Sequence, residues 1–295
     1  MRIEQPVRPG LRMECADGGR LVLTQGDRPV LFARQRAGHR GVHYARTGRY
    51  ASPVAPLRAG TARAVAALAA PGSDAWTERW AAYAEAELRV AAGGPLHEGD
   101  WNLGPMTPGW FVDGNWAKLL AHDPDRGRLT WFGYGDPAED ARDLLPLRAL
   151  SDPGSARVRA YRRQYREGVL PPVLLWWISG LNSPVVLDGH DRLVAALAEG
   201  GRPEVLLLSR AVDAAYVALC AARPVEEYAH RMAALGGGPL DGVRGAAAGQ
   251  ALARALRAIE RTPEITRAWP VAGGVSGWER AAATQVPGWG PAPLP

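Results

Sequence analysis

Residues 185–192 read Val185-Val186-Leu187-Asp188-Gly189-His190-Asp191-Arg192. The three apolar residues at the start are typical of a short buried strand, and the apolar residues at 193, 194 and 197 follow at the spacing of a helix. Gly200-Gly201 then supplies a helix stop. The stretch therefore predicts a strand that passes into a helix through a polar junction containing a glycine.

This junction is suited to binding an anion. The first N–H groups of a helix have no partner within the helix, and the helix dipole places partial positive charge there. Gly189 would let an anion approach the backbone, while His190 and Arg192 would add charge-assisted hydrogen bonds. The alternative is structural: Asp188 caps the helix, His190 fills the interior and Arg192 pairs with a surface acid. The motif by itself leaves both interpretations open.

The residues on either side predict a small α+β unit around this junction. The apolar runs are bounded by Pro and Gly, and Ser151-Asp152-Pro153 is a helix-start signal. The expected elements, in chain order, are a strand at 144–147, a helix at about 154–167, strands at 173–178 and 185–187, the motif helix, and a strand at 205–208.

This order, with Asp188-Gly189-His190-Asp191-Arg192 at the junction, resembles the ParB/sulfiredoxin-like superfamily, whose members carry an Asp-Gly-His-x-Arg or related motif at this place. The resemblance covers about residues 143–210, roughly a quarter of the chain. It implies a ParB/sulfiredoxin-like nucleotide-binding domain at 141–210.

Three activities compete within that superfamily. Sulfiredoxins place a catalytic cysteine where this chain has Gly189, which argues against a reductase. Chromosome-partitioning members bind CTP and continue into a DNA-reading helix-turn-helix, whereas the residues after Arg210 lack a basic recognition helix. Free-serine kinases carry Asp-Gly-His-x-Arg, and the motif of this chain resembles theirs most.

The kinase resemblance implies a site for ATP or ADP, with CTP as an alternative, and for Mg²⁺ that neutralises phosphate charge. The phosphate-binding residues that it implies are Gly189, His190, Asp191 and Arg192. Asp191 is the exception in this set, because its charge would repel a phosphate unless it points away or binds Mg²⁺.

The resemblance also implies two catalytic carboxylates. Asp188 would orient the acceptor hydroxyl or the metal. The kinases use a glutamate just after the first strand as catalytic base, and this chain offers Asp152 there instead. An aspartate reaches about one methylene less, and Asp152 is also suited to a capping role.

The expected helix at 154–167 carries a basic stripe. Because Val158, Tyr161 and Tyr165 share one face, several arginines must face solvent. The arginines considered for nucleic-acid binding are Arg159, Arg162, Arg163 and Arg166. Such a stripe can follow a phosphate backbone. It is equally explained as a solvated face in a chain that scarcely uses lysine.

Arginine supplies nearly all of the positive charge of this chain. The 295 residues include 35 basic residues, and Lys118 is the single lysine among them. A P-loop requires Gly-Lys-Ser/Thr, and Lys118 lies between Ala117 and Leu119, so that class of nucleotide-binding protein is excluded. The formal net charge of +5 does not demand a polyanionic partner.

Cysteine usage and hydropathy indicate the compartment. Cys15 and Cys220 match no metal-ligand or redox spacing, so we expect two reduced, buried thiols and no metal site. No apolar run approaches the roughly 20 residues that span a bilayer, and the first residues lack the apolar stretch of a secretory signal. We therefore expect a soluble, cytoplasmic protein without a membrane partner.

The rest of the chain predicts units that flank the motif domain. The expected fold class is α+β. The predicted divisions are a β-rich unit with two helices at 1–140, the motif domain at 141–210, helices at 211–268 and an irregular Gly/Pro/Trp tail at 269–295. Within them we expect a β-meander at 11–54, helices at 61–70 and 74–92, a second β-unit at 101–134 around a hairpin turn at 123–127, and helices at about 211–222, from Pro224, and at 241–259.

The favoured function is nucleotide-dependent phosphoryl transfer to a small hydroxyl-bearing substrate, serine-kinase-like in its chemistry. The first alternative is a ParB-like nucleic-acid-binding protein or nuclease that uses the arginine stripe. The second is a noncatalytic module that binds a ligand or a protein. Fold resemblance alone does not choose among them, because one scaffold hosts unrelated activities.

Overall fold

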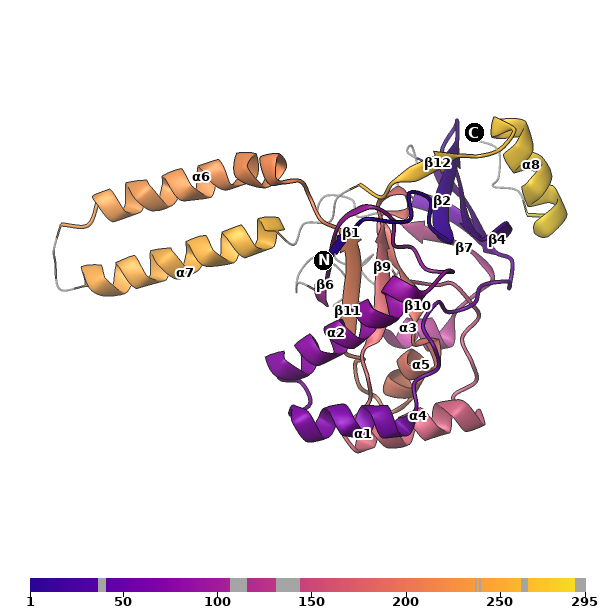
Figure 1. The fold of residues 1–295 in the computed structure, drawn as a ribbon, viewed down its shortest axis with the longest axis horizontal. Helices are drawn as coiled ribbons and strands as arrows, with labels where there is room; N and C mark the ends of the chain where they lie inside the picture. The colour runs from indigo at the N-terminus through magenta and orange to yellow at the C-terminus, as the bar shows by residue number, and fades with distance from the viewer. Residues whose placement is uncertain are drawn as a thin grey trace.

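The computed structural model describes residues 1–36, 41–106, 116–130, 144–236, 238, 240–260 and 265–289. Figure 1 shows two sheets with helices around them. The first sheet has the order β1 (Arg2–Ile3), β6 (Gly99–Pro105), β11 (Val205–Arg210), β9 (Val173–Ile178), β10 (Ser183–Asp188) and β8 (Leu145–Pro146). The second has the order β12 (Ala268–Pro270), β2 (Leu11–Ala16), β3 (Arg20–Gln25), β4 (Arg28–Arg36), β5 (Gly41–Arg46) and β7 (Arg126–Thr130). The predicted α+β class is confirmed.

The predicted meander forms the second sheet. Its strands β2, β3, β4 and β5 pair antiparallel in sequence order. The turn between β2 and β3 contains Gly18 and Gly19 at φ angles of 71° and 68°. Glycine adopts this left-handed backbone without the steric cost that other residues incur, which allows the tight turn between the two strands.

The predicted order of elements around the motif is also confirmed. β8 leads into α4 (Ala156–Arg166), β9 and β10 form an antiparallel pair joined by η3 (Ser179–Leu181), and α5 (His190–Ala198) leads into β11, which is parallel to β9. The predicted helix at about 154–167 is confirmed, but its predicted capping residue was wrong. Ser155 rather than Ser151 caps α4, because its Oγ accepts the N–H of Val158, while Ser151 donates to Asp191.

Helices cover both faces of the first sheet, and every residue of β9 is buried. The even-numbered residues of β9 pack in the cluster that contains Trp76 and Trp80 of α2 (Asp74–Val90). Its odd-numbered residues pack in the cluster that contains Leu193 of α5. A strand that is buried on both faces has a nearly continuous run of apolar residues in its sequence, as β9 does. The two predicted N-terminal helices, α1 (Ala59–Leu68) and α2, are confirmed.

The first sheet draws strands from both sides of the predicted boundary at 140. β6 pairs antiparallel with β11 from Leu206↔Pro105 to Arg210↔Trp101, and β1 pairs with β6. β12 likewise brings residues from the C-terminal part onto β2 of the meander. Each of the two sheets therefore contains strands from more than one of the predicted divisions of the chain.

The predicted second β-unit was wrong in its central part. Residues Trp116–Ala121 form α3, in keeping with the strong helix propensity of Ala, Lys and Leu, and β7 pairs with β5 rather than with a strand before 123. The expected turn at 123–127 is no hairpin, because it joins the helix α3 to β7, and its Asp123 and Asp125 accept hydrogen bonds from Arg46. The parts of this unit at 107–115 and 131–134 lie outside the described residues.

The C-terminal part departs from the prediction in two places. α6 (Ala214–Ala233) continues through Pro224, so the two helices expected there are one, and α7 (Asp241–Glu260) packs beside it. Good helix formers on both sides of Pro224 offset the lost N–H. The expected irregular tail contains α8 (Gly274–Gln285), whose buried Trp278 packs on Phe32.

Cys15 and Cys220 are free thiols, and both are half-buried rather than buried as predicted. Within the described part of the chain, none of the helices has the length and apolar character that a bilayer crossing requires.

Candidate functional site

The motif lies where β10 passes into α5, as the sequence predicts. Gly189 is the N-cap of α5 and has a φ of 91°, a left-handed conformation that explains why glycine stands there. A Cβ at this position would lie 2.8 Å from Nη2 of Arg192. This side of Gly189 therefore faces the Arg192 guanidinium, which takes the space that the sequence analysis assigned to an approaching anion.

Asp188 and Arg192 form an ion pair across the first turn of α5. Arg192 Nη2 lies 2.9 Å from Asp188 Oδ2 and also donates to the carbonyl of Pro172 at 2.9 Å. The other carboxylate oxygen of Asp188 accepts a hydrogen bond from Ser52 Oγ. Arg192 Nε is buried and has no hydrogen-bond partner within the described structure.

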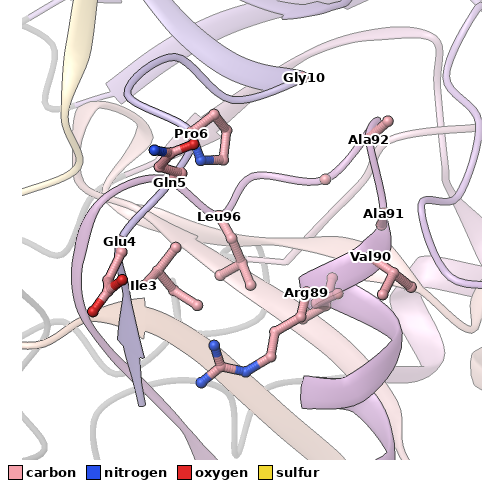
Figure 2. A pocket seen from close by; sticks show the side chains of 12 residues that line it. Ile3, Glu4, Gln5, Pro6, Gly10, Arg89, Val90, Ala91, Ala92 and Leu96 are labelled. Carbon is pink, nitrogen blue, oxygen red and sulfur yellow. The ribbon is translucent and has the colours of Figure 1, made fainter.

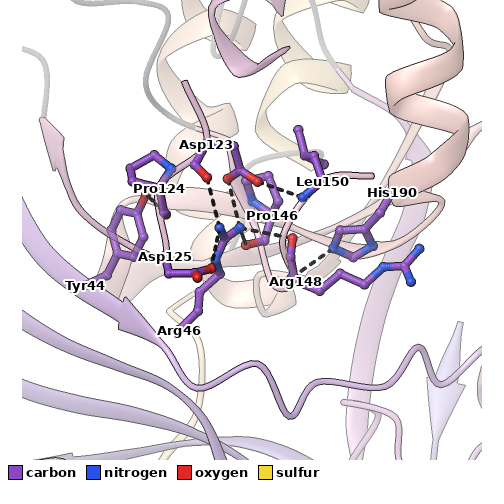
Figure 3. Close-up of polar contacts among 9 residues, drawn as sticks. All are labelled: Tyr44, Arg46, Asp123, Pro124, Asp125, Pro146, Arg148, Leu150 and His190. Carbon is purple, nitrogen blue, oxygen red and sulfur yellow. Dashed lines mark hydrogen bonds and ion pairs between the residues drawn. The ribbon is translucent and has the colours of Figure 1, made fainter. Parts of the chain in front are cut away.

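His190 is a buried neutral acceptor and not the cationic donor that the sequence suggests. Only 1% of His190 is exposed, and burial, together with the nearby charges of Arg148, Arg46 and Arg192, lowers its pKa well below 6.5. Its Nε2 accepts the backbone N–H of Arg148 at 3.4 Å, as Figure 3 shows. The neutral ring therefore carries its proton on Nδ1.

We expect a His190→Gln substitution to remove part of the pH dependence of stability. Because the folded pKa lies below 6.5, the unfolded chain binds a proton below that pH that the folded chain excludes. The stability contributed by neutral His190 is thus present above pH 6.5 and is lost as the pH falls below it. Urea unfolding at about pH 7.5 and pH 5.5 measures this difference, because the gap between wild type and variant should narrow on acidification.

His97 does not disturb this comparison, although burial lowers its pKa to about 4, because it is present in both proteins. Parallel stability curves for wild type and His190→Gln would show that His190 binds its proton equally in the folded and unfolded chain. That result would contradict the neutral buried state assigned to it.

Asp191 lies in a cluster of hydrogen-bond donors. It is 5% exposed, and its carboxylate lies 3.0 Å from Arg148 Nη2 and 3.3 Å from Arg157 Nε. Ser151 Oγ donates to its other oxygen at 2.6 Å. The repulsion expected between Asp191 and a phosphate is therefore offset by two arginines.

These residues line a small pocket at the start of α5. Its cavity volume is about 20 Å³, which is room for about one water molecule and far below the roughly 300–1,000 Å³ of a typical site for a whole small-molecule ligand. The lining residues are Pro56, Leu57, Arg148, Arg157, Tyr161, Asp188, Gly189, His190, Asp191 and Arg192. Three guanidinium groups thus border the pocket against two carboxylates. The lining of the pocket carries a net positive charge, but with the side chains in these positions the pocket has no room for a phosphoryl group.

The structure does not bring Asp152 into this pocket. Its Oδ1 accepts the N–H of Gly154 at 2.6 Å, and the residue is exposed. This contact is that of a turn residue whose side chain binds its own backbone. The role of Asp152 as a catalytic base stays a prediction that the geometry does not support.

The predicted basic stripe on α4 is partly neutralised. Arg162 Nε and Arg166 Nη1 lie 2.6 Å and 2.7 Å from Glu199 Oε1, and Arg159 donates to the carbonyl of Gly154. Arg162 and Arg166 lower the pKa of Glu199, first through the hydrogen bond from Arg162. Of the four arginines considered for nucleic-acid binding, Arg163 is exposed without such a contact among the described residues.

Arg46 binds the chain segment that places Arg148 beside the motif. Its side chain is 1% exposed and donates to Asp123 Oδ1 at 2.8 Å, to Asp125 Oδ1 at 2.9 Å, and to the carbonyls of Pro146 and Arg148 (Figure 3). Asp123 in turn accepts the N–H of Leu150 at 2.8 Å. Segment 146–150 is therefore fixed at both ends by a buried ion pair.

Sequence reasoning missed several residues of this site, including Arg46, Tyr50, Ser52, Arg148 and Arg157. The hydroxyl of Tyr50 donates to the carbonyl of Leu187, and its ring lies 6.0 Å from that of His190. Ser52 and Asp188 are 136 residues apart in the sequence. None of these residues stands in a recognisable motif, so only the arrangement of the chain in space brings them to Asp188.

A separate pocket lies between the N-terminal strand and the end of α2 (Figure 2). Among its lining residues the charged side chains are Glu4 and Arg89. Arg89 is already bound to Glu85 at 2.7 Å and to the carbonyl of Arg2. This pocket lacks a group of converging ionisable side chains, so the start of α5 is the better candidate.

Comparison with protein-family models, with curated proteins and with solved structures finds no match for this chain. The chemistry assigned to the site rests on its own residues and their geometry.

Proposed function

We propose that this protein is a nucleotide-dependent phosphotransferase that acts on a small hydroxyl-bearing substrate. The observation that supports the proposal is the convergence of Arg148, Arg157 and Arg192 on the start of α5, beside the carboxylate of Asp188. Guanidinium groups and free helix N–H groups are suited to phosphate. The order of elements at 143–210 and the Asp-Gly-His-x-Arg motif are similar to those of ParB-like free-serine kinases.

The pocket would accept the phosphate part of a nucleotide. Its cavity volume of about 20 Å³ means that arginines lining it would have to turn aside to admit a phosphate, and the ribose and base would lie outside it. Such a pocket would recognise the phosphate groups of a nucleotide more than its base, so ATP, ADP and CTP would all be suitable ligands. Arg148 and Arg157 keep 40% and 56% of their side chains exposed, which leaves them free to turn from Asp191 to a phosphate.

This site would supply few of the ligands that Mg²⁺ needs. Within the described residues, no group of three or more His, Cys, Asp or Glu side chains is placed to hold a metal. Mg²⁺ in nucleotide sites commonly takes one or two carboxylates, with phosphate oxygens and waters as its other ligands. Asp188 is the residue that would hold it, and the ion would neutralise phosphate charge.

Asp188 is also the residue that would orient the acceptor hydroxyl. Its carboxylate ends a buried strand, is 14% exposed, and is held between Ser52 and Arg192. A carboxylate with a fixed position can accept a hydrogen bond from a substrate hydroxyl and direct its oxygen toward phosphorus. A cytoplasmic location, where nucleotides are abundant, is part of this proposal.

We expect Arg192→Ala to weaken nucleotide binding by about 1.5–3 kcal/mol, or roughly 10- to 150-fold, the range for hydrogen bonds to charged groups. Titration calorimetry with ATP, ADP and CTP in the presence of Mg²⁺ measures the affinity. Arg163→Ala is the matched control, because it removes an exposed arginine from α4, outside the pocket. The nucleotide affinity of Arg163→Ala should equal that of wild type.

Arg192→Lys separates charge from geometry. Lysine keeps the charge but lacks the planar fork, so it should restore only part of the affinity. Failure of the wild-type protein to bind any nucleotide, or equal affinity in wild type and Arg192→Ala, would contradict the phosphate site.

A further inference from the structure

Ser52 is an exposed serine whose hydroxyl is bound by the carboxylate of Asp188. Its Oγ lies 2.5 Å from Oδ1 of Asp188, the length of a hydrogen bond from a hydroxyl to a charged carboxylate. A carboxylate only accepts, so the Ser52 hydroxyl is the donor. The same Oγ accepts the backbone N–H of Val54 at 3.2 Å. These contacts hold the oxygen of Ser52 against Asp188, with its proton directed at the carboxylate.

Asp188 is fixed on its other side as well. Its Oδ2 lies 2.9 Å from Nη2 of Arg192, and the same nitrogen donates to the carbonyl of Pro172. Ser52 therefore occupies the position beside Oδ1 in which Asp188 would orient an acceptor hydroxyl. The hydroxyl that this carboxylate binds in the structure belongs to the chain itself.

The segment that carries Ser52 runs along the proposed site. Two residues earlier, the buried Tyr50 donates to the carbonyl of Leu187, the residue before Asp188. Further along the chain, Pro56 and Leu57 line the pocket at the start of α5. Ser52 lies between these two points and is exposed, so a phosphate group can reach its Oγ from the solvent side.

Ser151 is another serine of this site that donates to a carboxylate, but its surroundings differ. Its Oγ lies 2.6 Å from Asp191, which is also bound by Arg148 and Arg157. Ser151 is half-buried, whereas Ser52 is exposed. The geometry therefore favours Ser52 as the hydroxyl that meets an incoming phosphate.

We propose that Ser52 is a phosphorylation site that the protein modifies itself, with a nucleoside triphosphate as the phosphoryl donor. This inference rests on the proposed phosphotransferase function and names one acceptor for it. Asp188 takes the proton of the Ser52 hydroxyl, and Oγ forms a bond to the γ-phosphorus of the donor. The bond from that phosphorus to the oxygen that bridges to the β-phosphate breaks, and its electron pair leaves with the nucleoside diphosphate. The proton on Asp188 then passes to water.

Incubation of the full-length protein with ATP and Mg²⁺, followed by intact-mass and peptide mass spectrometry, tests the proposal. Wild type should gain one phosphoryl group, on Ser52. Because Ser52 and Asp188 meet within one chain, the rate constant should be the same at low and high protein concentration. Asp188→Asn should be labelled at least about 100-fold more slowly, the lower end of what a positioned base contributes.

Ser52→Ala should gain no phosphoryl group at this position. Ser276→Ala is the matched control, because Ser276 is an exposed serine of α8, outside the pocket, and this variant should be labelled like wild type. Ser52→Thr keeps a hydroxyl and should take up the phosphoryl group on the new threonine. Circular dichroism checks that each variant is folded.

The outcomes separate this inference from the function on which it rests. Binding of ATP without phosphate on Ser52, phosphate on Ser151 instead, or equal labelling of wild type and Ser52→Ala would overturn the inference and leave the proposed function standing. A rate constant that rises with protein concentration would overturn transfer within one chain. Failure of wild type to bind ATP would overturn both.

Discussion

An Asp188→Asn variant is expected to keep its fold and its nucleotide affinity but to lose at least about 100-fold in turnover, the lower end of what a positioned acid or base contributes. Asparagine has nearly the shape of aspartate and can still accept from Arg192. The Ser52 hydroxyl can rotate to accept from the new amide. The variant loses the negative charge that would direct the acceptor hydroxyl or hold Mg²⁺.

Nucleotide turnover in the presence of candidate hydroxyl substrates, serine first, measures this effect. Asp213→Asn is the matched control, since Asp213 caps α6 through the N–H of Tyr216 at 2.8 Å, outside the pocket. Asp152→Asn is expected to keep its turnover, because Asp152 is bound to Gly154. A marked loss of turnover in Asp152→Asn would instead support the base predicted from the sequence.

Two outcomes would redirect the proposed function. Turnover at the wild-type rate in a folded Asp188→Asn protein would contradict the role given to this carboxylate. Nucleotide binding by the wild-type protein without turnover of any hydroxyl substrate would favour the noncatalytic ligand-binding module instead.

Arg46→Met is expected to lower the free energy of unfolding by about 3–5 kcal/mol, the usual cost of removing one partner of a buried ion pair. Methionine fills much of the same space but donates no hydrogen bond. Asp123, with 10% of its side chain exposed, would keep its charge without a counter-ion, and the carbonyls of Pro146 and Arg148 would lose their donor.

Urea unfolding at pH 7 measures this loss. Arg223→Met is the control, because Arg223 is 86% exposed, and its pair with Glu227 should contribute less than about 1 kcal/mol. Adding Asp123→Asn to Arg46→Met should recover part of the stability, since it removes the unpaired charge. A loss below about 1 kcal/mol for Arg46→Met would show that segment 146–150 keeps its place without this arginine.

The position of the motif could be predicted from the sequence because the evidence for it is local. The alternation of apolar and polar residues with turn residues between them marks the meander, and the run at 185–187 followed by helical spacing marks the junction at Gly189. Local pattern failed at Trp116–Ala121, where it predicted a strand, and at the tail, where it missed α8.

The sequence by itself determined which segments become strands and helices around the motif, and that Gly189 stands at a helix start. Only the tertiary structure decided the chemical state of the site. It made His190 a neutral acceptor, paired Asp191 with Arg148 and Arg157, and brought Ser52 to Asp188. The physical reason is that secondary structure follows from neighbours in the chain, whereas charge state and hydrogen bonding depend on burial and on groups more than a hundred residues away.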